Sequence, residues 1–228
     1  MDDIVHKTAK YSLGMQIFTG LLDVAALQID VEDKDVILKQ LVTIELIVQI
    51  IEGIFYIWLI KSYHTIKDIT KFRYYDWALS TSLMLYTLII YLSYLQEPNV
   101  KTLLEFQTDN KDTIQNVLGL NLLMLSLGYL GEIGKINRTV SVNIGFIPFL
   151  LYYKIIYDKY VKNASGLNKG QINLLFWYFF IFWSLYGVAA YMPYKTKNVG
   201  YNILDLFSKN FFGIFLSYQV FTKRKKSQ

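Results

Sequence analysis

Near the C-terminal end of the chain, residues 202–216 read NILDLFSKNFFGIFL. Lys209 and Asp205 are four residues apart, so on a helix they share one face, and almost all of their neighbours are apolar. A charged side chain inside a membrane is costly, which makes it a candidate functional residue. Two interpretations fit the spacing: a structural ion pair, or a lysine that carries a Schiff-base cofactor with Asp205 as counterion.

The rest of the chain has the composition of a membrane protein. Of its 228 residues, 54% are hydrophobic and only 18% are charged, against about 25% in soluble domains. A membrane helix needs about 20 mostly apolar residues. Seven such segments are expected, at 9–29, 36–61, 73–95, 113–133, 139–161, 170–192 and 199–222. A polar connection runs from residue 96 to 112, and the other breaks are short, so we expect one all-α seven-helix bundle, residues 1–228.

Several classes of site and partner are disfavoured. The chain has no cysteine, which excludes disulfides and thiolate metal sites. His6 and His64 are its two histidines, too few for a zinc site. The net charge of +5 is not gathered into a basic stripe interleaved with exposed aromatics, so a nucleic-acid partner is not expected.

Basic residues give a weak signal for orientation. Excluding Lys209, twelve Lys and Arg residues fall on the side of the C-terminus, among them the run Lys223–Lys226, and ten fall on the other side. Cytoplasmic loops carry the excess of Lys and Arg. We therefore expect a cytoplasmic C-terminus and an outside N-terminus.

The third segment carries a second set of charges. It opens with Arg73-Tyr-Tyr-Asp76-Trp77, and Asp76 lies about one helical turn inside from Arg73. Arg73 alone fits an interfacial side chain that extends its charge toward water. This interpretation leaves Asp76 unexplained, so Asp76 is a candidate functional carboxylate.

Arg-Tyr-x-Asp-Trp in the third segment, together with Asp-x-x-x-Lys in the seventh, resembles the microbial rhodopsins. In the sixth segment, Trp183-Ser-Leu-Tyr186 is similar to the Trp-x-x-Tyr wall of the retinal pocket in that family. The resemblance covers most of the chain. It implies a membrane photoreceptor, not an enzyme, with all-trans retinal bound as a Schiff base to Lys209.

The resemblance also implies roles for individual residues. Asp76 and Asp205 are expected to neutralise the protonated Schiff base, with Arg73 near Asp76 and with Asp76 as the proton acceptor. Tyr186 is expected to donate a hydrogen bond to Asp205. Gly187 and Ala190 stand where the family has larger residues, which predicts a looser pocket there. Further retinal contacts are expected from Trp77, Thr81, Asn121, Met124, Gly128, Phe149 and Trp183.

Two departures from the family pattern disfavour an efficient outward proton pump. The position that holds the reprotonating carboxylate, eleven residues after the acceptor, is Thr87. Lys195 and Lys197 occupy the segment in which the family places proton-release glutamates. A weak outward proton pump is the second hypothesis, and a sensory rhodopsin with a separate partner is the third.

Polar residues follow one face of the first, second and seventh segments. Their spacing of i, i+4 and i+7 is that of a helix face, and in the first segment it runs from Ser12 to Asp23. Carboxylate-lined pores favour cations, whereas interhelical hydrogen bonding is the alternative explanation. The candidate pathway residues are Ser12, Glu45, Gln49, Glu52, Asn198 and Asn202.

Glutamates in the second segment resemble those of channelrhodopsins, and the short chain resembles the group 1 viral rhodopsins of large algal viruses. This resemblance implies a light-gated channel for monovalent cations or protons in a lipid bilayer, and a homo-oligomer is compatible with it. We expect Glu45 and Glu52 to face Asn198 and Asn202. Glu52→Gln should then alter the photocurrent and leave the colour nearly unchanged.

Overall fold

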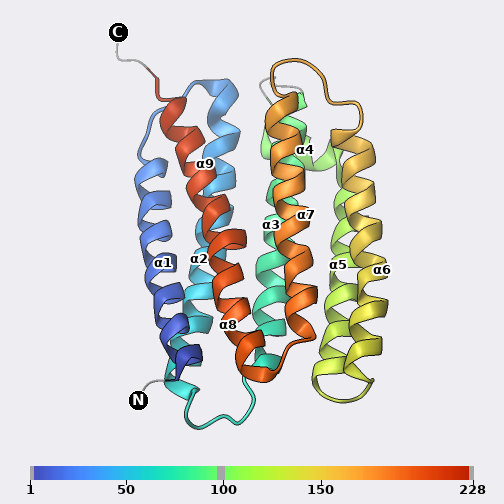
Figure 1. Ribbon diagram of the computed structural model, residues 1–228. Coiled ribbons are helices and arrows are strands. Elements are labelled where there is room, and N and C mark those ends of the chain that lie inside the picture. Colours follow the sequence, from blue (N-terminus) through green and yellow to red (C-terminus); the bar gives the residue numbers. More distant parts are fainter. Residues whose placement is uncertain (1–2, 97–100, 226–228) are drawn as a thin grey trace.

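Long helices lie side by side, and α1 begins at the opposite end of the bundle from the end of α9 (Figure 1). The computed structural model describes residues 3–96 and 101–225. Residues 97–100 of the predicted polar connection, and Lys226 of the basic run, lie outside this part of the chain. The described elements are α1 (Ile4–Leu27), η1 (Asp33–Asp35), α2 (Val36–Ser62), α3 (Thr70–Gln96), α4 (Leu103–Asp109), α5 (Lys111–Glu132), α6 (Arg138–Ile156), η2 (Tyr157–Val161), α7 (Lys169–Ala190), α8 (Tyr194–Asp205), η3 (Leu206–Asn210) and α9 (Phe211–Thr222).

The seven predicted segments are all present. α8, η3 and α9 form one continuous seventh segment, and η2 continues α6. The short helix α4 was not predicted, and it lies inside the connection that we expected to be only polar. Its start is fixed by a capping box, in which Thr102 and Glu105 each accept a hydrogen bond from the other's backbone N–H.

Two segments begin earlier than the apolar pattern indicates. The first begins at Ile4 because Asp3 caps it, accepting a hydrogen bond of 3.2 Å from the Val5 N–H. This hydrogen bond also holds the pKa of the Asp3 carboxyl below its ordinary value. The seventh begins at Tyr194, directly after Pro193. Both starts are polar turns outside the apolar run, which hydrophobicity alone does not reveal.

The outside of the bundle is apolar and the inside carries polar groups. By length and composition, five described stretches are suited to cross a membrane: Asp33–Ser62, Thr70–Gln96, Lys111–Glu132, Arg138–Val161 and Lys169–Ala190. The first and last segments are not among them, and both carry polar side chains that the bundle buries. Large apolar side chains such as Ile17, Ile54 and Leu79 are exposed on the outside, as expected for contact with lipid.

The seventh segment changes its helical winding in the middle. Leu206–Asn210 form a π-helical turn, η3, between α8 and α9. Such turns widen an α-helix locally and occur often at functional sites. Lys209 lies within this turn, so the residue singled out by the sequence also lies at the irregular point of its helix.

A buried ion pair joins α5 to α8. Lys197 Nζ lies 2.5 Å from Glu132 Oε1, and both side chains are almost fully buried. Removing one partner of a buried pair leaves an uncompensated charge, which costs about 3–5 kcal/mol. We therefore expect Lys197→Met to lower the midpoint of thermal unfolding, followed by circular dichroism in detergent. The double variant Lys197→Met/Glu132→Leu should recover most of the loss, and a double variant less stable than Lys197→Met would contradict this interpretation.

Candidate functional site

Lys209 lies at the centre of a cluster of carboxylates from three helices. Its Nζ donates to Asp76 Oδ2 at 2.7 Å, lies 3.1 Å from Glu52 Oε1, and lies 3.6 Å from Asp205 Oδ1. These side chains are all nearly inaccessible to solvent. Three carboxyl groups therefore surround Lys209 Nζ in the buried interior of the bundle.

Arg73 brings a second positive charge to this cluster. Its Nη1 lies 3.7 Å from Asp205 Oδ2, and its side chain donates to the amide oxygens of Asn198 at 3.0 Å and Asn202 at 2.5 Å. Arg73 therefore lies beside the cluster and forms an ion pair with Asp205. Three carboxylates and two cations share the site.

Two tyrosines fix the orientation of Asp205. Tyr186 donates to Asp205 Oδ1 at 2.6 Å, as the sequence predicts. Tyr56 donates to Asp205 Oδ2 at 2.5 Å, and its hydroxyl also lies 3.2 Å from the amide oxygen of Asn202. Tyr56 continues the polar face of the second segment after Glu52, but its hydrogen bond to Asp205 was not predicted.

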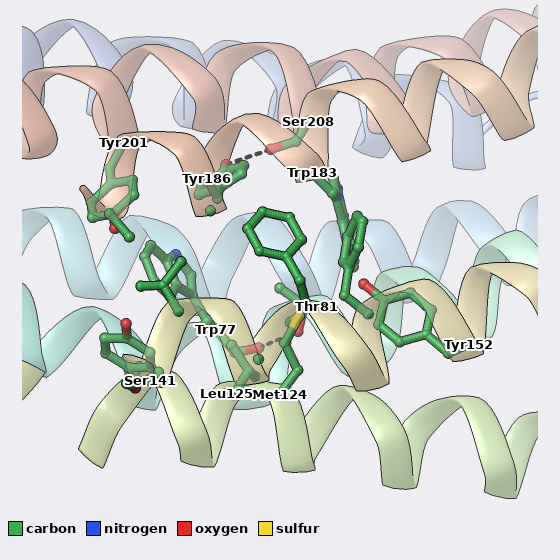
Figure 2. Close-up of a pocket in the computed structure, with 18 of the residues that line it drawn as sticks. Trp77, Thr81, Met124, Leu125, Ser141, Tyr152, Trp183, Tyr186, Tyr201 and Ser208 are labelled. Atoms are coloured by element: carbon green, nitrogen blue, oxygen red, sulfur yellow. Dashed lines mark hydrogen bonds between the residues drawn. The ribbon is translucent and has the colours of Figure 1, made fainter. Parts of the chain in front are cut away.

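A mostly apolar cavity opens beside Lys209, between α3, α5, α6 and α7 (Figure 2). Its wall is formed mainly by aromatic and aliphatic side chains, as in most small-molecule sites. Figure 2 shows Trp77, Thr81, Met124, Trp183 and Tyr186 around this space. The predicted contacts that line it are Lys209, Trp77, Thr81, Met124, Gly128, Phe149, Trp183 and Tyr186.

Asn121 is an exception among the predicted contacts. It does not line the cavity, and its amide donates instead to Thr81 Oγ1 at 2.9 Å. The reason is that Asn121 is on the face of α5 that packs against α3, so it orients a residue of the wall. Direct contact between Asn121 and the ligand stays a prediction.

The cavity wall near Gly187 is filled by an aromatic ring. A side chain at Gly187 would collide with the ring of Phe146, and both residues line the cavity together with Ala190. Gly187 therefore makes room for the ring of Phe146. The sequence had predicted only a looser pocket at this position. Phe146 comes from α6, and nothing in the local pattern of α7 indicates that it lies there.

Sequence analysis also missed several lining residues. Most of them are side-chain types that any buried helix face would contain, so their spacing carried no separate signal. Ser208 was recognisable only as the neighbour of Lys209, and its hydroxyl lies 2.6 Å from the Tyr186 hydroxyl. The missed lining residues include Met84, Tyr152, Tyr201 and Ser208.

This geometry defines the chemistry of the ligand. A mostly apolar cavity with aromatic rings in its wall suits a conjugated hydrocarbon. Among the described residues that line it, Lys209 supplies the one primary amine, which suits attachment through a carbonyl carbon. The nearby carboxylates can stabilise the positive charge that such a linkage carries when protonated. The site therefore fits a retinal-type chromophore bound to Lys209.

Comparison with known proteins agrees with this geometry. Residues 7–223 match the family model described as bacteriorhodopsin-like protein, so the chain belongs to this family of microbial rhodopsins. A search among curated proteins found no match.

Solved structures of the same fold include a viral rhodopsin. The chain is similar to the viral rhodopsin OLPVRII, with 28% identity, a TM-score of 0.83, and coverage of 96% of this chain and 99% of that one. It shares the fold of the blue light-absorbing proteorhodopsin from Med12, with 18% identity, a TM-score of 0.75, and coverage of 96% and 98%. Xanthorhodopsin, a light-driven ion pump with dual chromophore, has the same identity and TM-score, with coverage of 96% and 93%.

The family and the geometry together give the general class of the protein. Members of this family bind retinal through a Schiff-base lysine, and the chain is accordingly a retinal-binding, multi-pass membrane photoreceptor with retinal attached to Lys209. The predictions of fold, family and cofactor are confirmed.

The predicted pathway residues form a line of polar groups, in an order that differs from our expectation. Asn198 and Asn202 meet Arg73, and Ser12 donates to the Asn202 carbonyl at 2.8 Å. Glu52 lies next to Lys209, not opposite the asparagines. The prediction that Glu45 and Glu52 face Asn198 and Asn202 is therefore wrong.

Helix direction explains the difference. The seventh segment runs antiparallel to α2, so its early residues lie level with the late residues of α2, and Tyr56 meets Asn202. Gln49, one turn from Glu52, accepts a hydrogen bond of 3.1 Å from Asn210. Glu45 lies further toward the other end, beside Thr87 of α3. The polar line thus passes Lys209 and continues on both sides of it.

Proposed function

We propose that this protein is a light-gated cation channel whose pathway follows the polar line between α1, α2, α3 and the seventh segment. The observation that carries the proposal is the 3.1 Å contact between Glu52 and Lys209 Nζ. Glu52 belongs both to this line and to the chromophore's charge cluster. A change of charge at Nζ therefore acts directly on a carboxylate of the pathway.

When bound, retinal would supply light-driven isomerisation of its polyene chain, next to the Lys209 nitrogen. Asp76 Oδ2, at 2.7 Å, is the nearest carboxylate oxygen to Nζ and takes its proton. Once Nζ is neutral, Glu52 and Asp205 lose a shared cation, and their repulsion favours the entry of water and cations between α2 and the seventh segment. Arg73 and Tyr56 keep Asp205 in place during this change.

Buried carboxylates and amides favour cations over anions along this line. The transported ions are monovalent cations or protons. The excess of Lys and Arg on the side of the C-terminus favours a cytoplasmic C-terminus. Residues 1–228 then act as one domain, and the ions move between the outside and the cytoplasm.

A light-driven outward proton pump is the second candidate, and one contact favours it. Sequence analysis disfavoured a pump because Thr87 stands at the position of the reprotonating carboxylate. Glu45 lies beside Thr87 and is fully buried, so α2 supplies a carboxylate at the place where α3 lacks one. Similar folds with low identity include light-driven pumps such as xanthorhodopsin. In a pump, Glu45 would return a proton to Lys209 Nζ.

The Glu52→Gln variant tests whether Glu52 acts in the cation pathway or only in the surroundings of the chromophore. Because Glu52 contacts Lys209, we now expect this substitution to change the photocurrent and also to shift the absorption to longer wavelength, by less than the shift for Asp76→Asn. Photocurrents under voltage clamp and absorption spectra of the purified protein measure the two effects.

Glu45→Gln is the matched control, since it removes the same charge without contact to Lys209. It should alter the current and leave the colour unchanged. A Glu52→Gln variant with shifted colour and wild-type currents would restrict Glu52 to the chromophore's surroundings and argue against the pathway.

A further inference from the structure

The two histidines of the chain are far apart in the sequence but lie together at the end of the bundle where α1 begins (Figure 1). The ring centroids of His6, near the start of α1, and His64, just after α2, are 5.1 Å apart. The ring of Tyr63 stacks on His6 at 5.4 Å, with 10° between the planes, and lies 5.3 Å from His64. The function proposed above gives these three rings no role.

Histidine is the side chain whose charge ordinarily changes between about pH 5 and 8. Acid therefore adds positive charge to both rings of the pair, and two like charges at this separation repel each other. His6 is held inside the bundle, whereas His64 is exposed and can turn toward water. Acid thus favours a conformation in which the two rings separate.

The other described groups around the pair that carry charge or titrate come from α1, the α2–α3 connection and α8. The carboxyl of Asp3 caps α1 through the Val5 N–H and lies 3.1 Å from Lys195 Nζ, so both of its oxygens already have partners. Asp68 Oδ1 accepts a hydrogen bond of 2.9 Å from the Thr70 N–H at the start of α3. The remaining groups are two tyrosines, which stay neutral at these pH values, and four exposed lysines: Tyr63, Tyr194, Lys7, Lys10, Lys61 and Lys67. The two histidines are therefore the groups here whose ordinary titration falls in this range.

Hydrogen bonds tie this part of α1 to the polar line. Asn202 Nδ2 donates to the Val5 carbonyl at 3.1 Å and to Thr8 Oγ1 at 2.8 Å, and these two residues lie on either side of His6 in the sequence. Asn202 Oδ1 in turn accepts a hydrogen bond of 2.5 Å from Arg73. A shift of the first turns of α1 is therefore transmitted to Asn202 and Arg73, at the end of the polar line on the side of the N-terminus.

We propose that His6 and His64 form a pH sensor that lowers the photocurrent when the solution on the side of the N-terminus becomes acidic. The inference rests on the proposed channel function and adds a means of regulation to it. The charged rings separate, the attachment of Asn202 to α1 weakens, and the added positive charge repels cations that enter at this end. In the described structure neither histidine lines the retinal cavity, so substitutions at either should leave the colour unchanged.

Photocurrents at different pH values test this assignment. The full-length, retinal-loaded protein is recorded under voltage clamp while the pH on the side of the N-terminus is lowered from about 8 to about 5 and the other side is held constant. The wild-type current should fall several-fold. His6→Gln and His64→Gln should each keep the current of the alkaline state and lose most of this response. Because His64 is exposed, its variant should fold even if His6→Gln does not.

Lys61→Gln is the matched control, since it removes an exposed positive charge that does not titrate in this pH range. It should retain the full pH response. A reversing wild-type current that does not fall in acid, or that falls equally in both histidine variants, would overturn the sensor and leave the channel standing.

A measurement in the dark separates the sensor from the channel itself. In nuclear magnetic resonance spectra of the wild type, the signals of both histidine rings should move over the same pH range as the side-chain amide signal of Asn202. In His64→Gln the Asn202 signal should respond much less. If the wild-type current does not reverse, the channel is wrong, and the Asn202 signal then decides whether the histidines act on this end of the polar line. Histidine signals that titrate while the Asn202 signal stays fixed would contradict the sensor.

Discussion

Lys209→Ala should abolish the visible absorption band of the protein after reconstitution with all-trans retinal. Lys209 is the primary amine that lines the cavity, and its Nζ is held by Asp76 at 2.7 Å. Alanine cannot form the covalent link, so retinal would remain free and absorb at the shorter wavelength of the unbound aldehyde. The expected effect is complete loss of the band, which an absorption spectrum of the purified variant measures.

Lys197→Ala is the matched control for this experiment. Lys197 is also buried in the seventh segment, but it pairs with Glu132 and is not among the residues that line the cavity. The Lys197→Ala variant should keep its visible absorption band even if its stability falls. A normal visible band in Lys209→Ala would end the assignment of the site.

Asp76→Asn should shift the absorption to longer wavelength and slow or block proton loss from Lys209 Nζ. Asp76 is the carboxylate nearest to the nitrogen, and its negative charge stabilises the positive charge there in the ground state more than in the excited state. Removing this charge therefore narrows the energy gap between the ground state and the excited state of the chromophore. It also removes the proton acceptor, so both the spectrum and flash-photolysis kinetics should change.

Ser80→Ala provides the comparison, since in the described structure the Ser80 hydroxyl donates to the backbone carbonyl of Asp76, at 2.9 Å. It should change neither the colour nor the kinetics strongly. An Asp76→Asn variant with a wild-type spectrum and photocycle would move the counterion role to Asp205 and Glu52, the other two carboxylates near Nζ.

Much of the fold was predictable because most of the segments are long and apolar. Charged residues inside those segments were informative for the same reason, since few explanations other than function support Asp76 or Lys209 in a membrane. The ends of the helices were less predictable. Asp3 and Thr102 act through single capping hydrogen bonds, which leave little trace in hydrophobicity.

Contacts between helices were the least predictable part. Spacing places Glu45, Gln49 and Glu52 on one face of α2. It does not determine which residues of the seventh segment lie at the same level along the bundle axis. Antiparallel packing places Glu52 at Lys209 and leaves Asn202 to Tyr56. The same limitation explains Asn121, whose helix face was right but whose neighbour is Thr81 and not the cavity.

The current–voltage relation of the wild-type photocurrent tests the central claim most directly. Cells that express the retinal-loaded protein are illuminated under voltage clamp while the membrane potential and the cation gradients are varied. A light-gated channel predicts a current that reverses its direction, at a potential that moves with the Na⁺, K⁺ or proton gradient. A current that keeps one direction at all accessible potentials, whatever the gradients, would contradict the channel and favour the pump in which Glu45 returns the proton.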